Sequence, residues 1–120
     1  MIKHIILWQL REELTPEERA AIKANAKHNL EALQGQIDGL YEIRVITEAL
    51  DASNADMMLD STFLTEEALH NYSRDPRHTA VADTYVRPFI CHRSCINYKV
   101  YQDASGFPAK KRSLSCRYSA

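Results

Sequence analysis

The first hundred residues carry two kinds of hydrophobic pattern, one with the two-residue period of a strand and one with the spacing of a helix. Residues 2–10 are apolar on both faces of an extended chain and rich in β-branched side chains, which is typical of a strand inside a sheet. Residues 40–46, 56–63 and 94–101 alternate between two faces. A polar turn region at residues 51–54 separates the first two of these segments, so we expect them to form a hairpin.

Helix signals fill the intervals between these strands. Thr15-Pro16-Glu17-Glu18 supplies an N-cap, a proline at the first helical position and a glutamate that completes a capping box, and Gly35 is the expected end of this helix. Thr65 is expected to cap a second, short helix. Asp75-Pro76 ends it, because the residue before proline is driven out of the helical conformation. The same Asp75 is the expected N-cap of a third helix, which Pro88 closes.

The expected order of elements is β-α-β-β-α-α-β, an α+β sandwich in which helices cover one face of a four-stranded antiparallel sheet. The strand at residues 2–10 presents apolar side chains to both faces: Ile2, His4, Ile6, Trp8 and Leu10 on one, Ile5 and Leu7 on the other. Helices of the same chain can cover only one of these faces. We therefore expect a second copy of the chain to cover the other, as a homodimer.

Length and charge narrow the class of protein. The chain has 120 residues, enough for one domain with one core, and its 15 basic and 16 acidic residues give a net charge of −1. Because the two signs are interleaved, no overall field favours nucleic acid or a membrane surface as a partner. No apolar run approaches the roughly 18 residues of a membrane span, and the start does not read as a signal peptide, so we expect a cytoplasmic protein.

The end of the chain is expected to contribute little chemistry. Residues 102–120 hold few core formers and one small basic cluster at 110–112, so we expect a domain over residues 1–101 followed by a loosely ordered tail. Cys91 and Cys95 would lie ~13 Å apart on a strand, too far for a disulfide and awkward for one zinc ion. We expect buried, inert thiols, no metal site and, without a phosphate loop or nucleotide fingerprint, no cofactor.

The segment from Tyr72 to His78 places a phenol and an imidazole on either side of the break between two helices, as in an acid/base pair. His78 would be the third residue of its helix, where the helix dipole disfavours the imidazolium and leaves a ring that accepts a proton. The Tyr72 hydroxyl is suited to donate a hydrogen bond to an enolate, and His4 to orient a substrate. The alternative is an ordinary capped corner, with His4 as a hydrogen-bonded core histidine.

Three motifs together resemble the Dabb domain, the stress-responsive dimeric α/β-barrel family. They are the opening Met1-Ile-Lys-His-Ile-Ile-Leu-Trp-Gln-Leu, the stretch Leu33-x-Gly35-x-Ile-x-Gly39-Leu, and Tyr72-x2-Asp-Pro-x-His78 leading to Val86-x-Pro88-Phe89. The resemblance covers about residues 2–101 and implies a ferredoxin-like protomer whose sheet forms a barrel with that of its twin. Most members have no established activity. The exception, similar in fold, is the plant polyketide (olivetolic acid) cyclase, which closes a poly-β-ketone by aldol condensation without metal or cofactor.

The resemblance also implies roles for particular residues. In that cyclase, the tyrosine and histidine that match Tyr72 and His78 act at the active site, and a histidine matching His4 lines the same cavity. Ile6 and Trp8 share the face of His4 and are expected to line the cavity with it. Family members commonly carry histidine where this chain has Asp75.

Two functions from different classes follow. One is a cofactor-free enzyme that performs aldol or cyclase-type chemistry on a small apolar carbonyl compound, with His78 as base and Tyr72 as donor. The other is a non-catalytic, stress-associated dimer that is structural or holds a ligand. A cavity of roughly 300 Å³ or more, on which His4, Tyr72 and His78 converge, favours the enzyme or the ligand holder over a purely structural protein.

Overall fold

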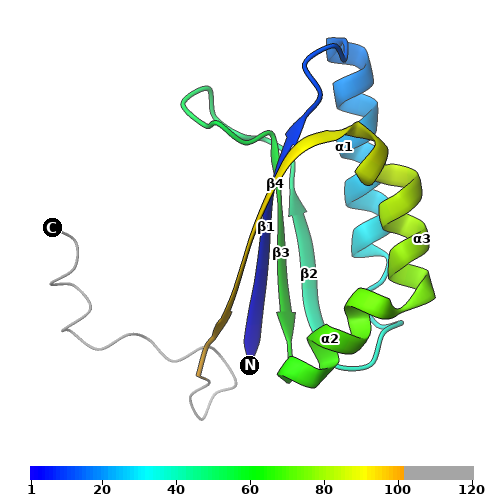
Figure 1. The fold of residues 1–120 in the computed structure, drawn as a ribbon, viewed down its shortest axis with the longest axis vertical. Helices are drawn as coiled ribbons and strands as arrows, with labels where there is room; N and C mark the ends of the chain where they lie inside the picture. The colour runs from blue at the N-terminus through cyan, green and yellow to red at the C-terminus, as the bar shows by residue number, and fades with distance from the viewer. Residues whose placement is uncertain (102–120) are drawn as a thin grey trace, which may run out of the picture.

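Three helices pack against one side of a twisted four-stranded sheet in the computed structural model, which describes residues 1–101 (Figure 1). The order of elements is the expected one. The elements are β1 (Ile2–Leu10), α1 (Pro16–Glu31), β2 (Leu40–Ile46), β3 (Met57–Phe63), α2 (Glu66–Arg74), α3 (Pro76–Tyr85), a single 3₁₀ turn η1 (Arg87–Phe89) and β4 (Ile90–Lys99).

The sheet has the strand order β2-β3-β1-β4, and every neighbouring pair is antiparallel. β1 therefore lies in the interior of the sheet, as its two apolar faces predicted. β2 and β3 form the expected hairpin, whereas β4 lies beside β1 at the edge of the sheet formed by the described residues. The β-α-β-β-α-α-β protomer with this antiparallel sheet is a ferredoxin-like fold.

Alternation along β1 divides its side chains between an inner face, covered by the helices, and an outer face. On the inner face, Ile2, His4, Ile6, Trp8 and Leu10 are all buried. Pairing register places Ser61, Leu59 and Met57 of β3 and Asn97, Cys95 and Arg93 of β4 beside His4, Ile6 and Trp8 on that same face. The outer face carries Ile5, which is half-buried, and Leu7, which is 41% exposed.

Most helix boundaries follow from the local chemistry of the caps. Thr15 and Glu18 form the expected capping box, with the Thr15 backbone N–H donating to Glu18 Oε1 (2.9 Å) and the Glu18 N–H donating to Thr15 Oγ1 (3.1 Å). α1 ends at Glu31 rather than at Gly35, because the chain leaves the helix through a series of tight turns. Gly35 adopts φ +85° within those turns, a conformation that favours glycine.

β4 differs most from the sequence-based prediction. It begins at Ile90, four residues before the expected start at residue 94, and ends at Lys99. The additional residues are held by pairing with β1, from Leu10 opposite Ile90 to Gln9 opposite His92. Cys91 and Cys95 consequently lie on this edge strand and are free and exposed, so the prediction of buried thiols was wrong.

Helices of the described residues are all too short or too polar to cross a membrane. The predicted tail at residues 102–120, together with Cys116, lies outside the described part of the chain.

Candidate functional site

The corner between α2 and α3 sets the positions of Tyr72 and His78. Asp75 caps α3 by accepting a hydrogen bond from the Arg77 backbone N–H (2.8 Å), and its carboxylate also holds the Arg77 guanidinium (Nη2–Oδ2, 2.8 Å). These bonds lower the pKa of Asp75 to about 2. Arg77 Nη1 in turn donates to the Gln36 carbonyl (2.5 Å), which ties the corner to the turn after α1. Asp75 therefore acts as a cap and clamp of the corner.

Across this corner, the rings of Tyr72 and His78 lie against each other. Their centroids are 4.1 Å apart, with 35° between the ring planes. His4 approaches Tyr72 from β1 at a centroid distance of 6.4 Å, edge to face, and Phe63 packs behind the phenol at 4.9 Å. The structure thus brings Tyr72 and His78 close to His4, from which they are 68 and 74 positions away in sequence.

A cavity of about 460 Å³ opens between the inner face of the sheet and α3. All five residues predicted for the site line it: His4, Ile6, Trp8, Tyr72 and His78. Its volume exceeds the roughly 300 Å³ typical of the smallest ligand sites. The remaining lining is mostly apolar, from Leu30, Leu59, Ala82, Val86 and Ile90.

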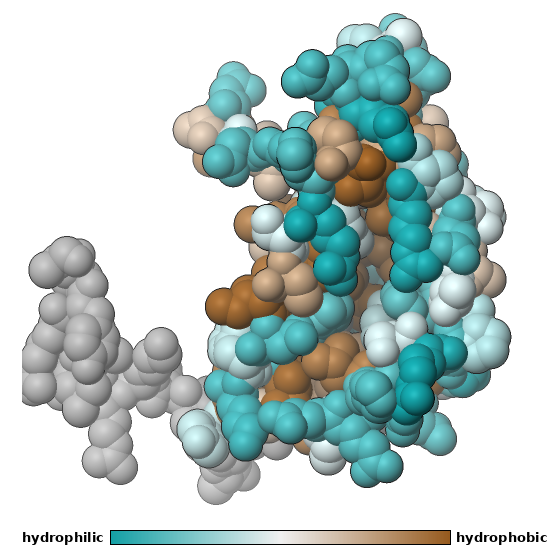
Figure 2. Space-filling view, in the orientation of Figure 1, coloured by the Kyte–Doolittle hydropathy of each residue, from teal (hydrophilic) through white to brown (hydrophobic). Residues whose placement is uncertain are grey.

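A second cavity of about 600 Å³ adjoins the first and shares His4, Ser73 and Arg93 with it. Together the two form a groove, which we call the β4 groove, between the inner face of β1 and β4 and the helices α2 and α3. In Figure 2 this side of the molecule shows a furrow between sheet and helices, with apolar residues in its depth and polar residues on its rims. The site is therefore reached from solvent along the edge strand.

Two polar atoms in the wall of the cavity have no hydrogen-bond partner among the described residues. They are the hydroxyl oxygen of Tyr72 and Nδ1 of His78, both shielded from solvent. Tyr72 is only 1% exposed. Leaving a buried polar group unpaired costs about 1–3 kcal/mol, so such atoms are rare in folded proteins. A molecule in the cavity that hydrogen-bonds to them would offset this cost.

Burial also sets the protonation of these groups. It raises the pKa of the Tyr72 phenol well above its ordinary value, so the hydroxyl keeps its proton and can donate it. The pKa of His78 is lowered to about 4, chiefly by burial and further by the positive charge of Arg87. The ring is neutral at pH 7, as predicted, and burial is the main cause.

His4 is fixed in one tautomer by a residue of β4. Its Nδ1 lies 2.5 Å from the side-chain oxygen of Asn97, and an amide oxygen only accepts, so Nδ1 carries the proton and Nε2 is left as an acceptor. The thiol of Cys95 lies 3.8 Å from the same nitrogen. Burial lowers the pKa of His4, the Asn97 bond opposes this, and the charge of Arg93 adds to the lowering. His4 is therefore both hydrogen-bonded in the core and part of the cavity wall.

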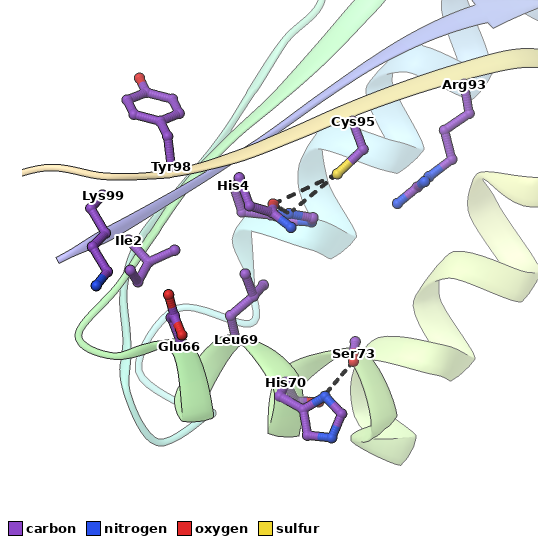
Figure 3. Close-up of a pocket in the computed structure, with 11 residues that line it drawn as sticks. Ile2, His4, Glu66, Leu69, His70, Ser73, Arg93, Cys95, Tyr98 and Lys99 are labelled. Atoms are coloured by element: carbon purple, nitrogen blue, oxygen red, sulfur yellow. Dashed lines mark hydrogen bonds between the residues drawn. The ribbon is translucent and has the colours of Figure 1, made fainter.

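Figure 3 shows the residues that the sequence-based prediction missed, among them Arg93 and Cys95 on β4 and Ser73 on α2. Arg93, Cys95 and Asn97 follow one another at the two-residue spacing of a strand face. This spacing was visible in the sequence, but only the pairing of β4 with β1 places the face beside His4. No three His, Cys, Asp or Glu side chains within residues 1–101 are grouped as metal ligands.

Comparisons with known proteins agree with this fold. The family model described as the stress responsive A/B barrel domain, Dabb, matches residues 2–100. No curated protein is similar enough in sequence to count as a relative.

Solved structures with the same fold include three of particular interest. A dimeric ferredoxin-like protein of unknown function from Bacteroides fragilis is 26% identical, with a TM-score of 0.77 over 82% of this chain and 94% of that one. A dimeric ferredoxin-like protein of unknown function from Thermobifida fusca is 21% identical, with a TM-score of 0.67 over 81% and 88%. A hydroxynitrile lyase from Passiflora edulis is 18% identical, with a TM-score of 0.63 over 85% and 94%.

Proposed function

Because the chain belongs to the stress responsive A/B barrel domain (Dabb) family, we propose that it is a homodimer whose protomers each use the cavity as a cofactor-free acid/base site. The proposed reaction begins with removal of a proton α to the carbonyl of a small, largely apolar compound. Addition of the resulting enolate to a second carbonyl would then close a ring, as in an aldol-type cyclisation. His78 is the proposed base and Tyr72 the proposed hydrogen-bond donor, while His4, Ile6 and Trp8 hold the substrate.

One observation carries this proposal: Tyr72 and His78 line a ligand-sized cavity with their rings 4.1 Å apart, and each holds a buried polar atom without a partner among the described residues. A purely structural corner would be expected to satisfy both atoms internally. The roles are assigned by protonation state, since a neutral imidazole accepts a proton and a phenol that stays protonated donates a hydrogen bond.

The chemistry needs only these two groups at the reacting atoms. The imidazole takes the α-proton, the C–H electron pair forms the enolate double bond, and the carbonyl oxygen takes up the negative charge. The Tyr72 hydroxyl donates a hydrogen bond to that oxygen. The low pKa of His78 makes the free ring a weak base, but the negative charge that develops beside it raises its affinity for the proton.

Dimerisation is proposed from the outer face of the sheet and from the similar structures described as dimeric. Leu7 of β1 and Ile96 and Tyr98 of β4 expose apolar surface there, at 41%, 59% and 45% of their areas. A second sheet packed on this face would bury these side chains and leave the β4 groove, on the opposite face, open to a ligand.

The experiment is solvent deuterium exchange, which detects proton removal without knowledge of the natural substrate. Wild type, His78→Gln and Tyr72→Phe are incubated in D₂O with an aryl methyl ketone, cyclohexanone and a 3-oxo ester, and loss of the α-proton signal is followed by NMR. We expect wild type to accelerate exchange, His78→Gln to lose roughly 100-fold and Tyr72→Phe to lose at least about 10-fold.

His28→Gln, on the exposed face of α1, is the matched control and should exchange like wild type. Thermal unfolding of each variant separates loss of chemistry from loss of fold. If the ketones bind but wild type exchanges them no faster than His78→Gln does, the catalytic proposal is wrong. The chain is then a ligand-holding dimer, the non-catalytic alternative.

A further inference from the structure

We propose that Arg93 forms a carboxylate-binding subsite in the β4 groove, so that the ligand is a carbonyl compound that also carries a carboxylate. The carbonyl part rests on the proposed function, whereas the carboxylate part rests on Arg93 itself.

Arg93 lies where the two cavities of the groove meet. It is opposite Trp8 in the register of β1 and β4, on the inner face, and it lines both cavities together with His4 and Ser73. In Figure 3 its side chain leaves β4 and its guanidinium points into the space between that strand and the helices. A ligand in the cavity of His78 therefore passes within the reach of this guanidinium.

The guanidinium has no carboxylate within 4.0 Å among the described residues, unlike its neighbour Arg87. Arg87 also lines the cavity, but its Nη1 pairs with Asp83 Oδ1 at 2.5 Å. The acidic side chain that lines the groove is Glu66, which lies at the far end near Lys99 (Figure 3). The charge at the centre of the groove is thus positive and uncompensated by this part of the chain.

This charge acts on the site already described, because Arg93 contributes to the lowered pKa of His4. A carboxylate on the guanidinium would neutralise that influence and raise the pKa of His4. Planar guanidinium forms two parallel hydrogen bonds to a carboxylate, which fixes the orientation of the group as well as its charge. One guanidinium beside neutral rings suits a monoanion better than the dianion of a phosphate monoester.

The test is a binding measurement that requires no turnover. Isothermal titration compares 4-oxo-4-phenylbutanoate with its methyl ester and with phenyl phosphate, on wild type, Arg93→Gln and the control Arg74→Gln, at an exposed arginine of α2 that lines neither cavity. We expect wild type and Arg74→Gln to bind the acid at least ~10-fold more tightly than the ester. Arg93→Gln should bind both alike, and Arg93→Lys should recover only part of the preference.

Imidazole NMR provides a second readout. The acid, but not the ester, should raise the pKa of His4 in wild type, and neither should do so in Arg93→Gln. The subsite is overturned if the acid fails to bind wild type more tightly than the ester, if Arg93→Gln keeps the preference, or if phenyl phosphate binds more tightly than the acid. Absence of deuterium exchange with an intact acid preference would instead overturn the proposed chemistry and leave the subsite standing.

Discussion

Polar side chains on the outer face of the sheet are paired, whereas two on the helices that cover the inner face are not. On the outer face, Asp60 of β3 accepts hydrogen bonds from Lys3 Nζ (2.5 Å) and Arg44 Nη2 (2.9 Å), and Lys3 also donates to Thr62 (3.0 Å). On the inner face, the hydroxyl of Tyr72 and Nδ1 of His78 lack partners within residues 1–101. The outer network is closed on itself, whereas the inner pair is left without partners in two residues that line a cavity.

The pKa shifts follow the same division. Burial by itself would raise the pKa of Asp60, but the hydrogen bonds from Lys3 and Arg44 outweigh it and keep the pKa below its ordinary value, so the charge is stabilised. Burial of Tyr72 is unopposed, and burial of His78 outweighs the opposing effects of the Ser73 backbone and the Asp75 charge, so both side chains stay neutral. The comparison teaches that buried polar groups of one small fold serve stability on one face and remain available for a ligand on the other.

The largest effect on stability is expected from breaking the outer network. Asp60→Ala would leave Lys3 and Arg44 without their shared carboxylate, and we expect the free energy of unfolding to fall by about 2–3 kcal/mol in urea denaturation. Asp83→Ala, which removes an exposed partner of Arg87, is the control and should cost less than about 0.5 kcal/mol. Equal losses in the two variants would show that the Asp60 network is not closed.

A smaller loss of stability is expected when the pH is lowered, because His78 is held neutral over the inner face of the sheet. His78 takes up a proton near pH 6.5 when unfolded but near 4 when folded, so the unfolded state binds more protons between these values. The free energy of unfolding should therefore be greatest above about pH 6.5 and fall as the pH drops towards about 4. We expect a loss of about 1–2 kcal/mol, less than a full shift would give because the ring is partly exposed.

The lowered pKa of His4 also makes the free energy of unfolding fall as the pH drops. Urea denaturation at several pH values should show that the free energy of unfolding depends less steeply on pH in His78→Gln than in wild type. In His28→Gln the dependence should be that of wild type. A slope in His78→Gln as steep as in wild type would mean that the His78 ring is not held neutral by the fold.

The smallest effect on the free energy of unfolding is expected from removing the unpaired hydroxyl of Tyr72. Tyr72→Phe deletes a buried hydroxyl that has no partner among the described residues, so stability should be unchanged or rise by up to about 1 kcal/mol. Tyr41→Phe, at an exposed tyrosine of β2, is the control. A loss of more than about 1 kcal/mol specific to Tyr72→Phe would show that the hydroxyl is hydrogen-bonded in the free protein and not kept for a ligand.

Sequence reasoning succeeded where the chemistry is local. The corner at Asp75-Pro76 follows from the restriction that proline places on the preceding residue and from the capping of α3 by the same aspartate. The interior place of β1 follows from its two apolar faces. These local features place Tyr72 and His78 on either side of a helix break and His4 on one face of β1, but that the three rings meet was implied only by the family resemblance.

What the sequence could not reveal depends on pairing between distant segments. Three features depend on β4 being the edge strand and on its register against β1. They are the extra residues of β4, the exposure of Cys91 and Cys95, and the bond between His4 and Asn97. Asn97 is 93 residues from His4 in sequence. The lack of a carboxylate beside Arg93 within residues 1–101 is likewise a property of the assembled groove, which no local pattern encodes.

The central claim is that the inner face keeps an imidazole neutral and available beside a protonated phenol. The most direct test is the pKa of His78, measured by NMR titration of the imidazole resonances in the ligand-free protein and assigned with His78→Gln. We predict a value of about 4, with the ring still neutral at pH 5.5. A value at or above the ordinary 6.5 would contradict the account, because it would mean that the ring is solvated or already paired within the protein.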